Sequence, residues 1–217
     1  MNTKRIFFWA AFIIILALIV WGLVAAMNKA PNTSKAGVPA PVSSVDHVRG
    51  NPNALVTLIE YEDFQCPACA TYFGIVDRLF NESSSTMRMV FRHFPLSQHA
   101  NAIPAAEASE AASNQGKFWQ MFDLLYANQT DWAEKTTADA DTIFDGFATT
   151  LGLNMTTFKA DEVASTTLAA ITAEQDEGTS IGIDHTPTFF VNGKEVSPTT
   201  YEDFKAIIDA AATSTAQ

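Results

Sequence analysis

The sequence predicts an α/β domain with a helical insertion, preceded by an N-terminal transmembrane helix. Residues 54–61 (ALVTLIEY) form a continuous apolar run with β-branched residues, which is typical of a strand buried on both faces. Strand-like and helix-like segments alternate at both ends of the domain, in the order β-α-β and β-β-α. Between these two ends, residues from about 98 to 180 show helical periodicity alone, which indicates the insertion.

The first element is a hydrophobic segment, since residues 6–26 contain no charged side chain. About 20 apolar residues are enough to cross a hydrocarbon core of about 30 Å, and Trp9 and Trp21 lie near the two ends of the run. We therefore expect residues 1–27 to be an anchor that spans the lipid bilayer through residues 6–26. The alternative is a cleavable signal peptide with a cleavage site at residues 24–26, but the run is longer than the usual h-region of about 7–15 residues.

A short basic N-terminus before an apolar run resembles an export signal, so the rest of the chain is expected outside the cytoplasm, in the periplasm or at the cell exterior. The predicted location is thus the cell membrane, with a single span and an extracytoplasmic domain, where disulfides persist. Residues 28–45 are rich in Pro, Ser, Thr, Ala and Gly and predict a flexible linker. The folded domain is expected at 46–212, followed by a frayed tail at 213–217.

Composition limits the classes of function. The chain of 217 residues carries 24 acidic and 13 basic side chains, and its formal net charge is −11. From Asp46 onward, nine basic side chains stand against all 24 acidic ones. Such a domain repels phosphate backbones, so we expect no nucleic-acid partner. Two cysteines allow at most one internal disulfide, which excludes a scaffold held together by several disulfides.

The remaining elements follow from periodicity and turn chemistry. A helix is expected to begin at Cys66-Pro67, because proline is tolerated at the first helical position, and residues 87–94 alternate as a second strand does. Near the C-terminus, Asn192-Gly193 predicts a hairpin between short strands at 188–191 and 194–196. Residues 201–212 then have the apolar spacing of a final helix.

The motif Cys66-Pro67-Ala68-Cys69 lies where the buried strand gives way to this helix. The free amides and the dipole of a helix N-terminus stabilise a thiolate, so the pKa of Cys66 is expected to be low. Cys69 lies one turn further in and is expected to be shielded, while the spacing allows a disulfide between the two. Stabilising the thiolate stabilises the reduced form, which makes the Cys66–Cys69 disulfide more oxidising.

Several segments together resemble the DsbA-like disulfide oxidoreductases, which have a thioredoxin fold. The resemblance covers most of residues 46–212, and its strongest part is the combination of the C-x-x-C motif with a Thr-Pro loop about 120 residues later. The segments that carry it are Glu60–Cys69 (EYEDFQCPAC), Phe94–Leu96, His99, Ala105–Ala108, Gln115–Trp119 and Thr186–Gly193 (TPTFFVNG).

The resemblance implies roles for residues around the cysteines. Pro187 is expected to be cis and to lie beside them, and the backbone of Thr186 is expected to pair with a bound substrate strand. Pro67 and Ala68, between the cysteines, are expected to contact substrate. Relatives often have His where this chain has Ala68, and His185 before the Thr-Pro loop is a candidate to replace that charge; a solvated loop histidine is the alternative.

Glu60, six residues before Cys66, occupies the position of a buried acid that is common in the thioredoxin superfamily. Burial would raise its pKa and let it exchange a proton with Cys69. The alternative is an acid at the end of a strand that reaches water. The four histidines, His47, His93, His99 and His185, show no zinc-ligand spacing, so no metal site is predicted.

These observations predict an extracytoplasmic thiol–disulfide oxidoreductase that introduces disulfides into exported proteins. Its partners would be unfolded exported polypeptides with free thiols and a membrane-bound, quinone-linked protein that re-oxidises it, as the resemblance implies. No dissociable cofactor is expected. The alternatives are a disulfide reductase or isomerase that uses the same motif, and an extracytoplasmic metal-binding or metal-delivery protein that uses the two thiols and a histidine.

Overall fold

The structure is a computed structural model, and it describes residues 36–215 of the chain. The predicted anchor at residues 6–26 and the first part of the predicted linker lie outside the described residues. Within residues 36–215, no helix has the length and apolar character needed to cross a membrane.

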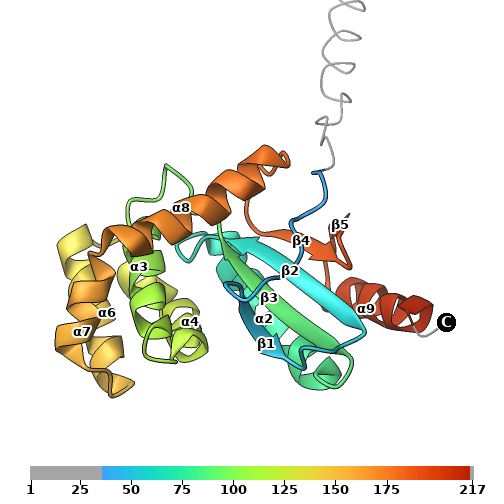
Figure 1. Ribbon diagram of the computed structural model, residues 1–217, viewed down its shortest axis with the longest axis horizontal. Helices are drawn as coiled ribbons and strands as arrows, with labels where there is room; N and C mark the ends of the chain where they lie inside the picture. The colour runs from blue at the N-terminus through green and yellow to red at the C-terminus, as the bar shows by residue number, and fades with distance from the viewer. Residues whose placement is uncertain (1–35, 216–217) are drawn as a thin grey trace, which may run out of the picture. The chain divides into compact units, whose positions relative to one another are not determined.

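A five-stranded sheet forms the centre of the domain, with the strand order β1-β3-β2-β4-β5 (Figure 1). The strands β2 and β3 are parallel, and the other neighbouring pairs are antiparallel. The strands are β1 (His47–Gly50), β2 (Val56–Glu62), β3 (Met87–His93), β4 (Thr188–Val191) and β5 (Lys194–Val196). The α/β class is confirmed, but β1 was not predicted, because a half-buried edge strand of four residues has no distinct apolar pattern.

Of the helices within residues 36–215, two flank the sheet and six form the insertion between β3 and β4. The helix α2 follows β2, and α9 ends the described chain. The helices are α2 (Pro67–Ser83), α3 (Ala102–Ser113), α4 (Phe118–Ala127), α5 (Gln129–Trp132), α6 (Thr137–Thr150), α7 (Met155–Glu162), α8 (Ser165–Ser180) and α9 (Tyr201–Thr215). The helical insertion is therefore confirmed, and α3, α4, α6 and α7 gather beside one end of the sheet (Figure 1).

Each face of the sheet has its own hydrophobic core. Alternate side chains of β2 point to opposite faces, so Leu58 belongs to one core and Ile59 to the other. The larger core contains the apolar faces of α2, α4 and α9, together with Phe64 and Trp132. The smaller core is closed by Ile183 and by partly buried residues that include Val42. The burial of β2 on both faces explains its continuous apolar sequence.

Residues 36–45, the second half of the predicted linker, lie on the surface of the domain. The backbone N–H of Ala36 donates to Glu195, and that of Gly37 donates to the carbonyl of Ile181, both at 2.6 Å. Arg92 donates to the carbonyl of Ala40 at 3.0 Å. These contacts attach the chain to the domain well before Asp46.

Candidate active site

Cys66 is the N-cap residue of α2, at the point where the sequence predicts the helix to begin. Its backbone is extended, and Pro67 follows at the start of the helix, where the missing N–H costs no hydrogen bond. The Cys66 N–H donates to the carbonyl of Asp63 at 3.0 Å, which closes the turn between β2 and the helix. Cys69 lies one turn later and is fully buried, whereas Pro67 and Ala68 are exposed. Both cysteines are free thiols in this structure.

The peptide bond between Thr186 and Pro187 is cis, and it lies beside Cys66. The Cys66 Sγ and the Thr186 carbonyl oxygen lie 3.6 Å apart across 120 residues of sequence, and the protonated thiol donates to this carbonyl. The antiparallel pairing of β2 with β4, which places Tyr61 opposite Thr188, brings these two segments together. The loop before β4 therefore forms the second wall of the site.

The pKa of Cys66 is lowered to about 5. The largest cause is a hydrogen bond from the side chain of Cys69, and burial opposes it. The Thr186 side chain and the backbone N–H groups of Ala68 and Cys69 also lower this pKa by favouring the thiolate. These amides belong to the first turn of α2, as expected for a cysteine at a helix N-terminus.

The pKa of Cys69 is shifted in the opposite direction, well above its ordinary value. Burial is the largest cause, followed by the hydrogen bond that Cys69 makes to Cys66 and by the negative charge of Glu62. At neutral pH the reduced pair therefore consists of a Cys66 thiolate and a protonated Cys69.

Two buried carboxyl groups, Glu60 and Glu62, lie on the same face of β2 behind the cysteines. Burial, together with the neighbouring Glu62, raises the pKa of Glu60 well above its ordinary value. Burial also raises the pKa of Glu62 to about 7, although Tyr126 donates a hydrogen bond to its carboxylate at 2.7 Å. Two acids so close together favour a state in which they hold one proton between them.

The position of Glu62 distinguishes it from Glu60. The charge of Glu62 is among the main causes that raise the pKa of Cys69. One carboxylate oxygen of Glu60 is buried without a hydrogen-bond partner among the described residues. Both acids line a cavity of about 10 Å³, which is close to the space that one water molecule needs.

Side chains from the insertion hold the loop that precedes Cys66. Gln129 of α5 donates to the carbonyls of Phe64 and Cys66, at 2.7 and 3.0 Å. The buried carboxylate of Asp63 accepts from the backbone N–H of Leu96 and from His99, at 2.9 and 2.6 Å. The insertion thus fixes the position of the first cysteine relative to the sheet.

A groove of about 270 Å³ runs along the Thr186–Pro187 loop. Its lining includes Thr186, Pro187 and Tyr72 of α2. His185 also borders the groove, but its side chain is 61% exposed and pairs with Asp184 at 2.8 Å. An extended peptide placed there would meet the backbone next to the cis bond.

The structure brings together Cys66, Cys69, Thr186 and Pro187, the central residues of the sequence-based prediction. It also places Glu60 in the buried position expected of it. Glu62 was missed, although the alternation of side chains along a strand puts it on the same face as Glu60. Gln129 was missed as well, because its contact with Cys66 spans 63 residues and depends on the fold of the insertion.

Comparisons with known proteins agree with this geometry. A family model described as thioredoxin matches residues 43–210. Among solved structures, α-DsbA1 of Wolbachia pipientis superposes with a TM-score of 0.73 at 19% identity, over 81% of this chain and 94% of that one. Oxidised BdbD of Bacillus subtilis superposes with a TM-score of 0.72 at 21% identity, over 82% of this chain and 99% of that one. At these identities, the structures establish a shared fold.

The curated relatives are much longer proteins. This chain is 36% identical over 154 residues to the Na⁺/H⁺ antiporter NhaA 1 of Mycolicibacterium gilvum, and 41% identical over 151 residues to that of Salinispora arenicola. The matches cover 69% of this chain in both cases, and 24% and 22% of the antiporters. The chain therefore spans about a quarter of the length of these relatives, and the similarity carries no argument about ion transport.

Proposed function

The chain belongs to the thioredoxin family and has the fold of DsbA-like proteins, and we propose that it is a thiol–disulfide oxidoreductase that introduces disulfides into exported proteins. The observation that carries this proposal is the low pKa of Cys66, about 5, at the N-terminus of α2 beside a cis-proline loop. Each unit by which a thiolate is stabilised makes a two-electron couple more oxidising by about 30 mV. The disulfide of this pair is therefore expected to be a strong oxidant.

The proposed reaction begins with the Cys66–Cys69 disulfide. A substrate thiolate attacks the Sγ of Cys66 and forms a mixed disulfide, while the electron pair of the broken bond leaves with Cys69. Because the pKa of Cys69 is high, its sulfur takes up a proton, and the Glu60–Glu62 pair is the nearby buried group able to supply one.

A second substrate thiolate then attacks the substrate sulfur of the mixed disulfide. Cys66 leaves as a stable thiolate, and the substrate gains a disulfide while the enzyme pair is reduced. The low pKa of Cys66 favours this step because a more acidic thiol is a better leaving group.

Substrate recognition is proposed to use the groove beside Pro187. An extended polypeptide can pair with the backbone of Thr186. Because the Thr186 carbonyl oxygen lies 3.6 Å from the Cys66 sulfur, this pairing would place a substrate cysteine next to Cys66. Pro67 and Ala68, which are exposed between the two cysteines, are proposed to contact the substrate as well. Recognition through the backbone suits an enzyme that acts on many unfolded polypeptides.

The cellular setting is proposed from the sequence. Residues 6–26 would hold the protein in the membrane, with the catalytic domain in the periplasm or at the cell exterior, where exported polypeptides emerge. A quinone-linked membrane protein would return the pair to its disulfide form.

The direction of the reaction can be tested by equilibrating the Cys66/Cys69 pair with glutathione and by measuring the pKa of Cys66. An oxidase is expected to have a potential well above that of a reducing thioredoxin, which is about −270 mV. A strongly reducing potential together with an ordinary thiol pKa would favour the reductase or isomerase instead.

The chemistry can be tested with a matched pair of variants. Cys69→Ser is expected to accumulate mixed disulfides with exported proteins through Cys66, whereas Cys66→Ser is expected to accumulate none, because the buried Cys69 meets no substrate. A metal carrier would only lose metal affinity in either variant. Among the described residues, the one group of three possible metal ligands contains neither cysteine, which counts against that alternative.

A further inference from the structure

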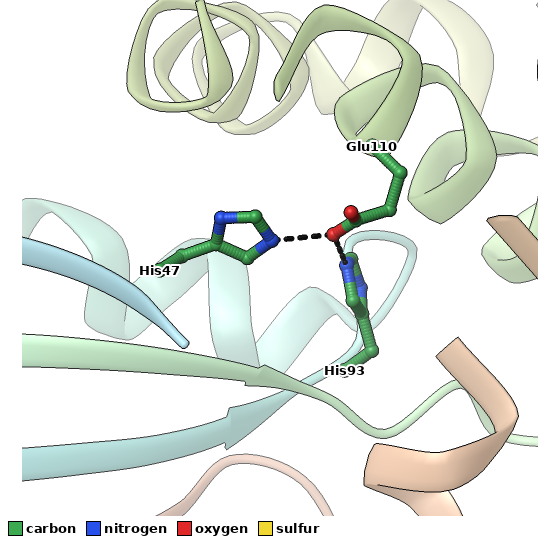
Figure 2. Close-up of side chains that lie close together, drawn as sticks. All are labelled: His47, His93 and Glu110. Carbon is green, nitrogen blue, oxygen red and sulfur yellow. Dashed lines mark hydrogen bonds and ion pairs between the residues drawn. The ribbon is translucent and has the colours of Figure 1, made fainter. Parts of the chain in front are cut away.

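Two histidines and a glutamate converge outside the redox site (Figure 2). His47 comes from β1, His93 ends β3, and Glu110 lies on α3. The Nε2 atoms of both imidazoles point to the same carboxylate oxygen of Glu110, at 2.5 Å for His47 and 2.9 Å for His93. All three ligand atoms lie within 4.8 Å of one another.

From this convergence, we propose that His47, His93 and Glu110 bind a divalent transition-metal ion of the zinc class. Two imidazole nitrogens and one carboxylate oxygen form a donor set that zinc accepts. Tetrahedral zinc with ligands at about 2.0–2.1 Å needs donor atoms about 3.3 Å apart. The ion therefore requires the nitrogens to move away from the Glu110 oxygen by less than about 1 Å.

The surrounding residues hold the two rings in place. The His47 ring stacks on Phe118, with centroids 3.5 Å apart and planes 5° from parallel. The His93 ring meets the edge of Phe91 with centroids 4.9 Å apart, and its side chain is only 2% exposed. Rings fixed in this way lose little freedom when they bind an ion, which favours affinity.

A fourth ligand has room on the open side of the cluster. A pocket of about 470 Å³ reaches the site, and its lining includes His47, Glu110 and Glu174. A carboxylate oxygen of Glu174 accepts from the backbone N–H of His93 at 2.5 Å, which places this acid next to the cluster. Water from the pocket, or Glu174 itself, is therefore available to complete a tetrahedral site.

The metal would act on stability rather than on disulfide exchange. The three ligands belong to the edge strand β1, to the neighbouring strand β3 and to the insertion, so one ion would cross-link the sheet to α3. An ion that binds the folded chain and not the unfolded one raises stability in proportion to the logarithm of its concentration. Neither Cys66 nor Cys69 belongs to this site.

The test uses the full-length protein in its disulfide form, because free thiols would bind zinc themselves. After dialysis against ZnCl₂, metal analysis is expected to find one zinc ion per chain, and the melting temperature is expected to rise with zinc and not with calcium. Co²⁺ in place of zinc is expected to give the visible absorption of a tetrahedral site with nitrogen and oxygen ligands.

Two variants and one control locate the site. Glu110→Gln and His47→Gln are each expected to weaken zinc binding by at least about 10-fold and to abolish the cobalt spectrum. His185→Gln, which changes an exposed histidine, is expected to bind zinc as the parent does. The glutathione equilibrium of each variant reports whether the domain is still folded.

The proposal is overturned if the disulfide form binds no stoichiometric zinc. It is also overturned if folded Glu110→Gln and His47→Gln bind zinc as tightly as the parent. If neither variant folds, the parent protein alone still tests the proposal. The proposal is then refuted if the parent binds no zinc, or if its cobalt spectrum lacks tetrahedral character.

Discussion

The two cysteines of one motif occupy opposite environments. Cys66 lies at the tip of α2, next to the Thr186–Pro187 loop that borders the groove, and its pKa is lowered to about 5. Cys69 lies one helical turn deeper, fully buried, and its pKa is raised by burial and by the charge of Glu62. A single turn of helix thus separates a thiol that ionises easily from a buried thiol that does not.

The largest expected effect is a difference in alkylation rate between the two thiols. In the reduced protein at pH 6, most Cys66 is thiolate and almost no Cys69 is, so iodoacetamide is expected to modify Cys66 at least about 100-fold faster. The rate at Cys66 should fall as the pH falls through about 5, because the thiolate is lost below its pKa. Mass spectrometry of the modified peptide measures both rates.

The matched control is Cys69→Ala, which removes the hydrogen bond that contributes most to the low pKa of Cys66. In this variant, the pH at which the alkylation rate of Cys66 reaches half its maximum is expected to be higher than in the parent protein. Equal alkylation of both cysteines in the parent would contradict the asymmetry.

A smaller effect is expected from the acid behind Cys69. Attack by Cys69 on a glutathione–Cys66 mixed disulfide requires loss of the Cys69 proton, and Glu62, with a pKa of about 7, can accept it at higher pH. Glu62→Gln is expected to slow this step by about 10- to 100-fold at pH 8 and to remove the rise in rate near pH 7. Stopped-flow measurement of glutathione release gives the rate.

Glu60→Gln is the matched variant, because Glu60 shares the face and the burial of Glu62, whereas Glu62 is the acid whose charge raises the pKa of Cys69. We expect its rate to keep the rise near pH 7, with the midpoint unchanged or at higher pH, because the hydrogen bond from Glu60 lowers the pKa of Glu62. If Glu60→Gln removes the rise and Glu62→Gln keeps it, the proton passes through Glu60, as the sequence alone suggested.

The sequence predicted the parts of the site that depend on local chemistry. Cys66 follows a buried strand and precedes a proline that starts a helix, so its environment is determined within a few residues. The sequence pattern does not single out Glu62, because the apolar run ends at Tyr61, one residue before the strand itself does. The cluster of His47, His93 and Glu110 has no regular spacing, since its members lie on three elements that only the folded sheet and insertion bring together.

A further test concerns the wall of the groove. The Thr186 hydroxyl is buried without another hydrogen-bond partner among the described residues, and its side chain favours the Cys66 thiolate. Thr186→Val keeps the shape and removes the hydroxyl, so the pKa of Cys66 is expected to rise by about one unit, which is about a tenfold change in the thiolate equilibrium. Absorbance of the thiolate at 240 nm during a pH titration measures this pKa.

Thr188→Val provides the control for this experiment. The Thr188 hydroxyl donates to the carbonyl of His185 at 2.7 Å and does not contact Cys66, so the pKa of Cys66 is expected to be unchanged. A shift of equal size in both variants would mean that the loop moved and that the hydroxyl of Thr186 has no special role.

The smallest expected effect is at His185. The sequence made this residue a candidate to supply positive charge to Cys66, but its side chain is largely exposed and already faces Asp184. Solvent screens such a charge, and the partner carboxylate offsets it, so His185→Gln is expected to move the pKa of Cys66 by less than about 0.3 unit. The same titration at low and high salt measures this pKa. If the pKa of Cys66 rises by a full unit at low salt and the rise disappears at high salt, His185 does supply positive charge to Cys66. An unchanged value would leave the helix end, Cys69 and Thr186 as the sources of the low pKa, all of them fixed by the fold and not by a surface charge.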